Sequence, residues 1–217
     1  MFGNIDLLQI LLSIPAILIA FTFHEFAHAV VADRLGDRTP RFQGRITLNP
    51  MAHIDILGFI MFLVARFGWA KPVQTNPSAY KNYYKDDMKV SFAGPLANLI
   101  IAVIFIPIFL IYSKFFSYQI ISSSVLSVIS EILINIAYYN VILFVLNLIP
   151  IPGFDGYHIL SDIFPSTFNK LNYKIGNFQI VIMILFIATP ISSYLVGVPS
   201  NWIFKTLYKV FGSIIYI

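Results

Sequence analysis

The stretch "FTFHEFAHAVV", residues 21–31, places two histidines and a glutamate inside an otherwise apolar part of the sequence. The apolar run extends from about Ile5 to Ala32, which is long enough for a helix that crosses a lipid bilayer. An ionisable side chain at the centre of such a helix costs roughly 2.5–3.5 kcal/mol even on insertion scales. Ionisable residues in a membrane helix therefore indicate function, and this stretch bears on both the fold and the chemistry.

The composition predicts a multi-pass membrane protein. The chain has 217 residues, of which 58% are hydrophobic and 11% are charged, and its mean hydropathy is +0.80. Soluble domains usually contain about 25% charged residues. The formal charge of +4 does not indicate a nucleic-acid partner, because the cations lie in loops between apolar runs. The absence of cysteine excludes disulfides and thiolate chemistry.

Four apolar stretches predict membrane-spanning helices, at about residues 5–32, 88–112, 125–149 and 178–198, the last with a kink at Pro190. The stretch from Ile54 to Val64 is too short to cross comfortably and predicts a re-entrant or interfacial segment. The tail from Asn201 onward is amphipathic in its first half and either lies on the membrane surface or returns into the membrane. The number of spans is therefore about four to six.

The segment "RFQGRITLN", residues 41–49, alternates in polarity around Gly44 and predicts a short β-hairpin. The predicted fold class is thus an all-α polytopic membrane protein with a short re-entrant segment and a small membrane-associated β-hairpin. We expect a single membrane-embedded domain over residues 1–217, with a core at about 5–165 and C-terminal helices at about 177–217.

The distribution of cations predicts the orientation in the membrane. Of the fourteen Lys and Arg residues in the chain, nine fall in one stretch: Arg34, Arg38, Arg41, Arg45, Arg66, Lys71, Lys81, Lys85 and Lys89. By the positive-inside rule this stretch is cytoplasmic, which requires that the re-entrant segment does not cross. The first span then ends inside, the second runs outward and the third returns inward.

The cluster His24-Glu25-Phe26-Ala27-His28 has the pattern H-E-x-x-H. Residues four apart share one face of a helix, so both imidazoles can reach one metal ion. The glutamate beside them is then placed to take a proton from water at that ion, as in a metalloprotease. The alternative is that the histidines only pack between helices, but the cost of ionisable groups in an apolar span argues against it.

A catalytic zinc site has three protein ligands and one open position, so a third ligand must come from elsewhere in the chain. Asp155 in "PGFDG" is the best candidate, because it follows the inner end of the third span, at the level of His24 and His28. Glu131 is the competitor, but it lies 24 residues earlier, about 36 Å along a continuous helix. On the predicted topology Glu131 is at the outer surface, out of reach of the histidines.

The motif "AGPLAN", residues 93–98, supplies small residues for close helix packing and an amide in apolar surroundings. Asn98 is interpreted either as a contact to substrate or to the transition state, or as an interhelical hydrogen bond, with equal weight. The other polar residues are interpreted as follows: His158 as interfacial, His53 and Asp55 as a hydrogen-bonded pair, and Asp37 and Asp87 as solvated loop charges.

Together these motifs resemble the site-2 protease family of intramembrane zinc metalloproteases, in its short form without a PDZ domain. The resemblance covers most of the chain, from about Phe21 to His158, and includes "HEFAH", "LNPMAHID", "GWAKPVQTNP", "FAGPLAN" and "NLIPIPGFDG" in the order that the family shows. It implies a hydrolase that cleaves peptide bonds in or near transmembrane helices of substrate proteins. Gln74 departs from the family pattern, which commonly has a second proline there.

The resemblance also implies the roles of the site residues. His24, His28 and Asp155 correspond to the ligands of one Zn²⁺ ion, Glu25 to the acid/base, and Asn98 to the residue in contact with the substrate or the transition state. The expected partners are a transmembrane protein or peptide substrate and the lipid bilayer, with no nucleic acid, and the oligomeric state is open. The expected location is the cell membrane, with the active site toward the cytoplasm.

Two other functions remain as alternatives. A membrane metal transporter could also place His and Asp in membrane helices, but transporters typically contain internal repeats and polar residues in several helices at the midplane. We find no internal repeat, and the ionisable groups form one compact set. A catalytically inactive membrane scaffold is the second alternative, and the complete ligand set argues against it.

Overall fold

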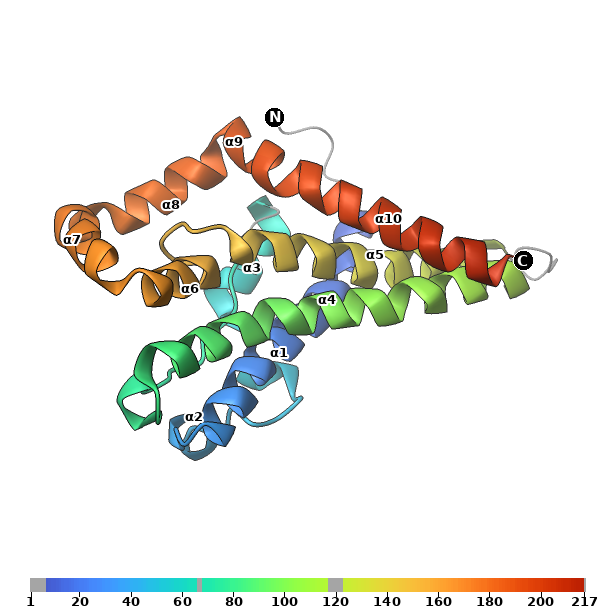
Figure 1. Ribbon diagram of the computed structural model, residues 1–217. Helices are drawn as coiled ribbons and strands as arrows, with labels where there is room; N and C mark the ends of the chain where they lie inside the picture. Colours follow the sequence, from blue (N-terminus) through green and yellow to red (C-terminus); the bar gives the residue numbers. More distant parts are fainter. Residues whose placement is uncertain (1–6, 66–67, 117–122, 217) are drawn as a thin grey trace.

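The computed structural model describes residues 7–65, 68–116 and 123–216, so the predicted start of the first span at Ile5 lies outside it, as does residue 217. The described chain is mainly helical (Figure 1). The α-helices are α1 (Leu7–Arg34), α2 (Thr39–Phe42), α3 (Ile56–Ala65), α4 (Tyr83–Phe116), α5 (Ser123–Leu148), α6 (Asp155–Ile163), α7 (Pro165–Ile175), α8 (Gln179–Ala188), α9 (Pro190–Ser192) and α10 (Val198–Ile215). Shorter helical turns are η1 (Pro50–Ala52), η2 (Pro77–Ala79), η3 (Gly176–Phe178) and the π-helical η4 (Ser193–Gly197).

Within the described residues, 4 helical stretches are long and apolar enough to cross a membrane. Three are α1, α4 and α5, which match the predicted spans at 5–32, 88–112 and 125–149. Helix α3 has 10 residues and is not among them, in agreement with the expectation that this piece is too short to cross. The prediction of an all-α polytopic membrane protein is therefore confirmed.

The predicted β-hairpin at residues 41–49 is wrong. Pro40 lies in the first turn of the short helix α2, where its fixed backbone angle suits a helix. The backbone N–H of Arg45 then donates to the carbonyl of Pro40 at 2.9 Å, which closes the chain on itself. The alternation in polarity does not reflect a strand with one solvent-exposed face, because the Arg45 side chain turns inward and is 5% exposed. The β contact in the described chain is an isolated bridge between Ile54 and Ala70.

The fourth candidate span differs from the predicted one. It runs from Pro165 to Ala188 through α7, η3 and α8. Thr189 then adopts an extended conformation, with φ −101° and ψ 159°, because a residue that precedes proline disfavours the helical region. A kink at Pro190 within a span at 178–198 was expected, but the chain turns there and the helix ends. Helices α8 and α10 form two arms that meet at α9 (Figure 1).

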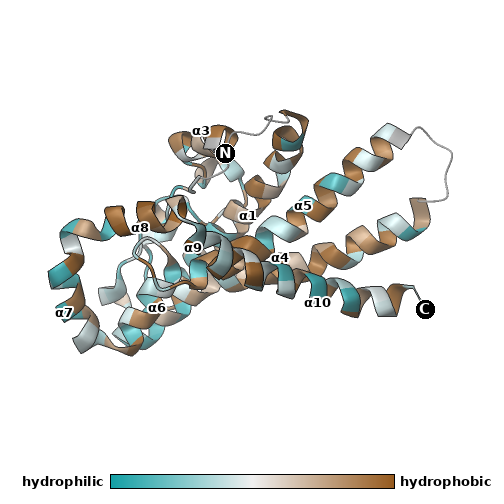
Figure 2. Ribbon diagram, turned by 90° about the horizontal axis from the view of Figure 1, so that it is seen from above, coloured by the Kyte–Doolittle hydropathy of each residue, from teal (hydrophilic) through white to brown (hydrophobic). Residues whose placement is uncertain are grey.

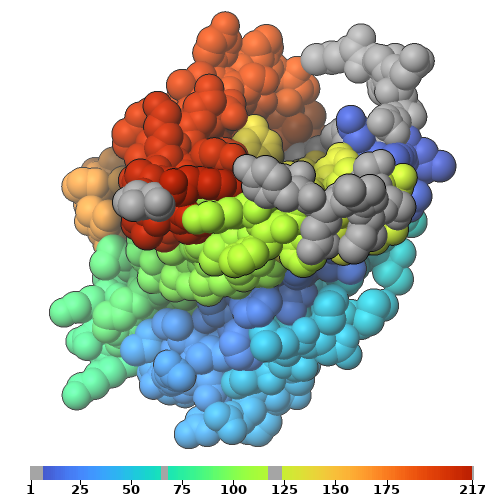
Figure 3. All heavy atoms as spheres, turned by 90° about the vertical axis from the view of Figure 1, so that its right-hand side faces the viewer, coloured from blue at the N-terminus to red at the C-terminus, as the bar shows by residue number. Residues whose placement is uncertain are grey.

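The tail beyond Asn201 packs along the membrane helices. Ile106 and Leu110 of α4 are fully buried, and they form a cluster with residues that recur every three or four positions on α10: Phe204, Leu207, Phe211 and Ile215. The Tyr216 hydroxyl donates to the Leu110 carbonyl at 3.2 Å. Figure 3 shows the ends of α4 and α10 side by side.

Helices α1, α4 and α5 form the centre of the structure. Ala16 of α1 is fully buried against Ile101 of α4 and Ile136 of α5, and a small residue here lets the three helices approach closely. Asn98 and Asn140 are both fully buried and joined by a hydrogen bond of 2.8 Å from Asn98 Nδ2 to Asn140 Oδ1. This polar link between α4 and α5 fixes their register next to α1.

The outer surfaces of α3 and α8 are apolar. Figure 2 shows α3 and α8 as mostly hydrophobic ribbons. On α8 the side chains of Ile180, Ile184 and Leu185 are 69%, 54% and 57% exposed. Exposed apolar surface of this extent marks a membrane interaction. The distribution supports a multi-pass protein whose lipid-facing side includes α8.

Helix α6 is held by a close approach of its first turn to the end of α5. A Cβ atom on Gly156 would lie 2.3 Å from the carbonyl oxygen of Leu148, closer than real contacts allow. Phe154, just before the helix, is 7% exposed and packs on Phe186 of α8, with ring centroids 6.0 Å apart. The glycine therefore sets the position at which Asp155 enters the structure.

We expect Gly156→Ala to destabilise the protein by about 1–3 kcal/mol, because the added methyl group overpacks a contact with backbone. Gly212→Ala in α10 is the matched control, since nothing lies within 4 Å of the added atom. Alanine favours a helix over glycine by roughly 0.5–1 kcal/mol, so the control should be neutral or stabilising. Thermal unfolding in detergent measures both, and equal transition temperatures would contradict this account of Gly156.

Candidate metal centre

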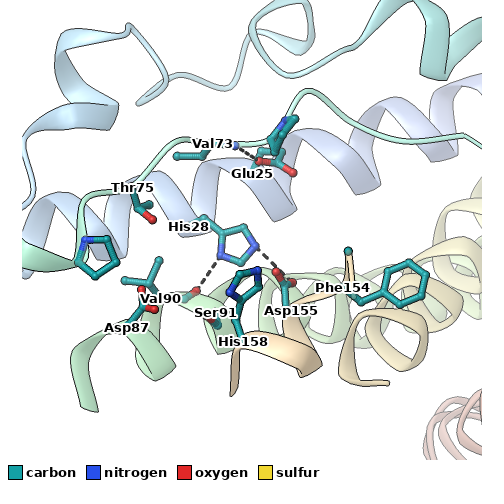
Figure 4. Close-up of a pocket in the computed structure, with 13 residues that line it drawn as sticks. Glu25, His28, Val73, Thr75, Asp87, Val90, Ser91, Phe154, Asp155 and His158 are labelled. Carbon is teal, nitrogen blue, oxygen red and sulfur yellow. Dashed lines mark hydrogen bonds and ion pairs between the residues drawn. The ribbon is translucent and has the colours of Figure 1, made fainter. Parts of the chain in front are cut away.

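Three side chains from two distant parts of the chain converge on one point. His24 and His28 lie one turn apart on α1 and are 7% and 8% exposed, and Asp155 is the first residue of α6. The Nε2 atoms of the two histidines are 3.1 Å apart. Asp155 Oδ2 lies 3.2 Å from His24 Nε2 and 3.3 Å from His28 Nε2. Figure 4 shows the His28 ring directed at Asp155.

The opposite ring nitrogens fix the protonation of both imidazoles. His24 Nδ1 is 2.8 Å from Asn98 Oδ1, and His28 Nδ1 is 2.7 Å from the carbonyl oxygen of Val90. Because these oxygens only accept, each Nδ1 carries the proton and donates it. Each Nε2 of a neutral imidazole then presents a lone pair toward the other and toward Asp155.

The convergent atoms are all acceptors, which suits a cation. Asp155 Oδ2 is buried and has no hydrogen-bond donor within the described residues. Two lone pairs and a carboxylate oxygen at this separation repel one another unless positive charge lies between them. Tetrahedral zinc with bonds of about 2.0–2.1 Å places its ligand atoms about 3.3–3.4 Å apart, close to the observed distances. His24, His28 and Asp155 could therefore hold one zinc ion and leave a fourth position open.

Asn98 orients His24 through a saturated set of hydrogen bonds. Its Nδ2 donates to the carbonyl of Ala20 at 3.0 Å and to Asn140 Oδ1 at 2.8 Å. Its Oδ1 accepts from His24, and the whole side chain is fully buried. Both N–H donors of the amide are thus engaged within the helix bundle.

Glu25 lies beside the histidines and is held by a neighbouring extended segment. Its Oε2 accepts from the backbone N–H of Val73 at 2.7 Å, as Figure 4 shows. A guanidinium nitrogen of Arg45 is 3.7 Å from the same oxygen. No hydrogen-bond or ionic partner of the other oxygen, Oε1, is found in the described part of the chain.

The extended segment at residues 70–76 is tied to the loop that follows α1. The backbone N–H of Lys71 donates to the His53 carbonyl at 2.9 Å, and the Lys71 carbonyl accepts from Arg45. At its far end Asn76 N donates to Asp37 Oδ2 at 2.6 Å. These contacts place Val73 against Glu25.

The burial and the contacts of Arg45 and Asp37 were not predicted from the sequence. Asp37 was expected to be a solvated loop charge, but it is 1% exposed, and its Oδ1 accepts from the backbone of Thr39 at 2.8 Å. An aspartate often accepts from the backbone N–H two residues later, and the Asp-x-Thr-Pro pattern could have indicated this turn. Nothing in the sequence indicates that Arg45 turns inward.

The expected pair of His53 and Asp55 does not form. His53 Nε2 donates to the carbonyl of Thr47 at 2.7 Å, and Asp55 Oδ1 accepts from the backbone of Gly58 at 2.8 Å. Asp55 precedes α3, so it caps the first turn of that helix. Both residues stabilise local structure away from the three convergent ligand atoms.

Two cavities meet at Glu25 and Asp155. One, of 420 Å³, is lined mainly by apolar residues, including Phe21, Leu143 and Met183. The other, of 390 Å³, has polar walls that include Thr75, Asp87 and His158. Both cavities have Glu25 and Asp155 in their lining, so the convergent carboxylates are accessible from two directions.

Gly94 of α4 makes room for the histidines. A Cβ atom at this position would lie 2.3 Å from His28 Nε2 and 2.7 Å from His24 Cε1. The motif "AGPLAN" therefore brings α4 into direct contact with the ligand face of α1. A larger residue would displace the two imidazoles that converge on Asp155.

We expect Gly94→Ala to weaken zinc binding by roughly 10–100-fold, the usual effect of disturbing the residues that orient metal ligands. Gly197→Ala is the control, because no atom lies within 4 Å of its added methyl group. Competition with a zinc chelator measures the affinity of each purified variant. Zinc affinity of Gly94→Ala equal to that of the control would contradict the close packing described here.

Over most of its length the chain is similar to proteins that are named as putative zinc metalloproteases. It is 35% identical over 199 residues to "Putative zinc metalloprotease YwhC" of Bacillus subtilis, which covers 91% of this chain and 90% of that protein. It is 29% identical over 210 residues to "Putative zinc metalloprotease Rip2" of Mycolicibacterium smegmatis, covering 93% of this chain and 73% of that protein. It is 30% identical over 165 residues to "Putative zinc metalloprotease MJ0611" of Methanocaldococcus jannaschii, covering 74% of each.

No solved structure matches the chain. Residues 12–189 match the family described as Peptidase family M50, a range that contains both histidines on α1, the whole of α4 and α5, and Asp155. The family match thus spans all the side chains that converge in the structure. The chain therefore belongs to peptidase family M50, the site-2 protease family, and is a zinc metalloprotease of the membrane.

Proposed function

We propose that this chain, as a single membrane-embedded domain, cleaves peptide bonds in or near transmembrane helices of substrate proteins. His24, His28 and Asp155 hold one zinc ion, and Glu25 is the acid/base. The observation that carries the proposal is the set of three acceptor atoms 3.1–3.3 Å apart, beside a carboxylate of which one oxygen has no partner among the described residues.

Zinc bound at this site would act as a Lewis acid and lower the pKa of water to about 7. Glu25 takes a proton from the attacking water and passes it to the nitrogen of the leaving amide. The N–H of Val73 and the guanidinium of Arg45 hold Oε2, so the transfers use Oε1. A carboxylate fixed by one oxygen keeps the other in a constant position between the water and the leaving group.

Asn98 has a positioning role in this proposal. Its two N–H donors are engaged by Ala20 and Asn140, so it has no donor left for a substrate oxygen. We assign to it the orientation of His24, through the hydrogen bond between His24 Nδ1 and Asn98 Oδ1. These hydrogen bonds support the interhelical interpretation of Asn98 over the interpretation as a contact to the substrate.

The two cavities suit a reaction that joins a lipid-borne substrate to water. The apolar cavity beside Leu143 and Met183 accepts a segment of a membrane helix, and the polar cavity admits water. A helical substrate uses its backbone carbonyls in hydrogen bonds, so it must unwind locally before cleavage. Substrates with weak helix formers near the scissile bond should therefore be preferred.

The orientation in the membrane follows from the cations. The cation-rich stretch from Arg34 to Lys89 joins the end of α1 to the start of α4. His28 lies near that end of α1, and its Nδ1 contacts Val90 near the start of α4. The positive-inside rule then supports an active site toward the cytoplasmic side.

We expect Glu25→Gln to keep zinc and to lose cleavage of a model transmembrane substrate, because the amide cannot accept the proton. Asp155→Ala should lose both, since only two ligands remain. Metal analysis of purified protein and cleavage in detergent micelles are measured on the same samples. Wild-type activity in both variants would refute the proposed function.

We expect Val73→Pro to lower the cleavage rate about 10–100-fold with normal zinc content, because it removes the N–H that holds Glu25. Gln74→Pro is the matched control. The backbone N–H of Gln74 makes no hydrogen bond within the described residues, and its side chain bonds only Gln43. Equal loss of activity in both variants would show that rigidity of the segment, and not the bond to Glu25, is responsible.

A further inference from the structure

The polar cavity connects the metal centre to residues that the proposed reaction does not use. Glu25, His28 and Asp155 line one part of the cavity, and Asp87 and His158 line another. Figure 4 shows Val90 and Ser91 between Asp87 and Asp155. Asp87 is half-buried and stands on α4, one turn before the carbonyl that orients His28.

Asp87 lacks a cation of its own. No lysine or arginine nitrogen lies within 4.0 Å of its carboxylate in the described chain, and His158 across the cavity forms no ion pair with it. Two other aspartates differ, since Asp86 pairs with Lys89 at 2.6 Å and Asp33 pairs with Arg41 at 2.7 Å. A half-buried carboxylate with no partner is costly unless a ligand supplies the positive charge.

The spacing along α4 sets the distance from Asp87 to the site of cleavage. Gly94 lies against His28 Nε2 and follows Asp87 by two helical turns. Seven residues of helix correspond to about 10.5 Å. An extended peptide advances about 3.3 Å per residue, so roughly three residues of an unwound substrate cover this distance.

Membrane helices supply a cation of the right kind. Lysine and arginine are enriched where a helix leaves the bilayer on the cytoplasmic side. When the scissile bond lies at the metal centre, the cytoplasmic flank of the substrate extends through the polar cavity toward the start of α4. An ammonium or guanidinium group on that flank would meet Asp87, for which the described part of the chain offers no competing cation.

We propose that Asp87 is a specificity residue that selects substrates with a lysine or arginine about three residues from the scissile bond, on its cytoplasmic side. The inference rests on the proposed proteolysis and names its substrate class. The ion pair forms inside a partly enclosed cavity, where charge-assisted hydrogen bonds are stronger than at an open surface. Asp87 thereby fixes the distance between the basic flank and the cleaved bond.

Two model substrates test the proposal. Both share one transmembrane helix and differ by a lysine or a glutamate at the third residue from the mapped cleavage site. Wild type should cleave the lysine substrate with a kcat/KM about tenfold higher than that for the glutamate substrate. The full-length Glu25→Gln variant should bind the lysine substrate about tenfold more tightly than the glutamate substrate. Asp87→Asn should abolish both differences, Asp87→Glu should retain them, and Asp87→Lys should reverse them.

Asp162→Asn is the matched control, because Asp162 stands on α6 near Asp87 but does not line the cavity. Burial and the charge of Asp87 raise the pKa of Asp162 to about 7, so assays at pH 8 keep most of the Asp162 carboxyl groups charged in the parent protein. The control should keep the preference for lysine. A preference that survives in Asp87→Asn, or that disappears equally in Asp162→Asn, would overturn the proposal.

The binding assay separates this proposal from the proteolysis on which it rests. If zinc-loaded wild type cleaves neither substrate, the proposed function fails. The ratio of the two dissociation constants in Glu25→Gln, with and without Asp87→Asn, still decides the role of Asp87. If cleavage occurs with no preference between lysine and glutamate, the inference about Asp87 is wrong and the proteolysis stands.

Discussion

The structure depends on one electrostatic constraint, the meeting of two imidazole lone pairs and a carboxylate oxygen inside a bundle of apolar helices. Atoms of this kind at 3.1–3.3 Å repel one another, and water has little access to stabilise them. Only positive charge between His24, His28 and Asp155 makes the arrangement favourable. A cation at this point would link α1 to the first turn of α6, and both of these helices pack on α4.

The helix bundle provides the rigidity that this arrangement needs. Asn98 joins α1 to α4 and α5 through three hydrogen bonds, and it fixes the tautomer of His24. The Val90 carbonyl fixes that of His28. Gly94 allows α4 to approach so closely that both ring nitrogens point at one position. Each of these three residues belongs to α4, so this helix acts as the template on which the ligands of α1 are arranged.

Local patterns and long-range packing differed in how well the sequence predicted them. Helix periodicity alone predicts that His24 and His28 share one face. The proximity of Asp155 was predicted from its position along the apolar runs, which places it at the same depth in the membrane as the histidines. The role of Asp155 as a metal ligand stays a prediction. The hairpin at residues 41–49 failed because burial of Arg45, which depends on Glu25 and Lys71, overrides local alternation. The span at 178–198 failed at Thr189, where the rule for residues before proline carried more weight than hydropathy.

A protease inside a membrane must bring together two things that avoid each other, an apolar helix and water. The two cavities separate these requirements and share one wall, which contains Glu25 and Asp155. In the proposed mechanism, a substrate in the apolar cavity and water in the polar one would meet at that wall. The buried carboxylate of Glu25 is fixed there by Val73 and Arg45, which belong to loop segments and not to the spans. In the proposed mechanism, proton transfer by Glu25 thus depends on the loop segments that hold this side chain, whereas the candidate metal ligands are held by the helices.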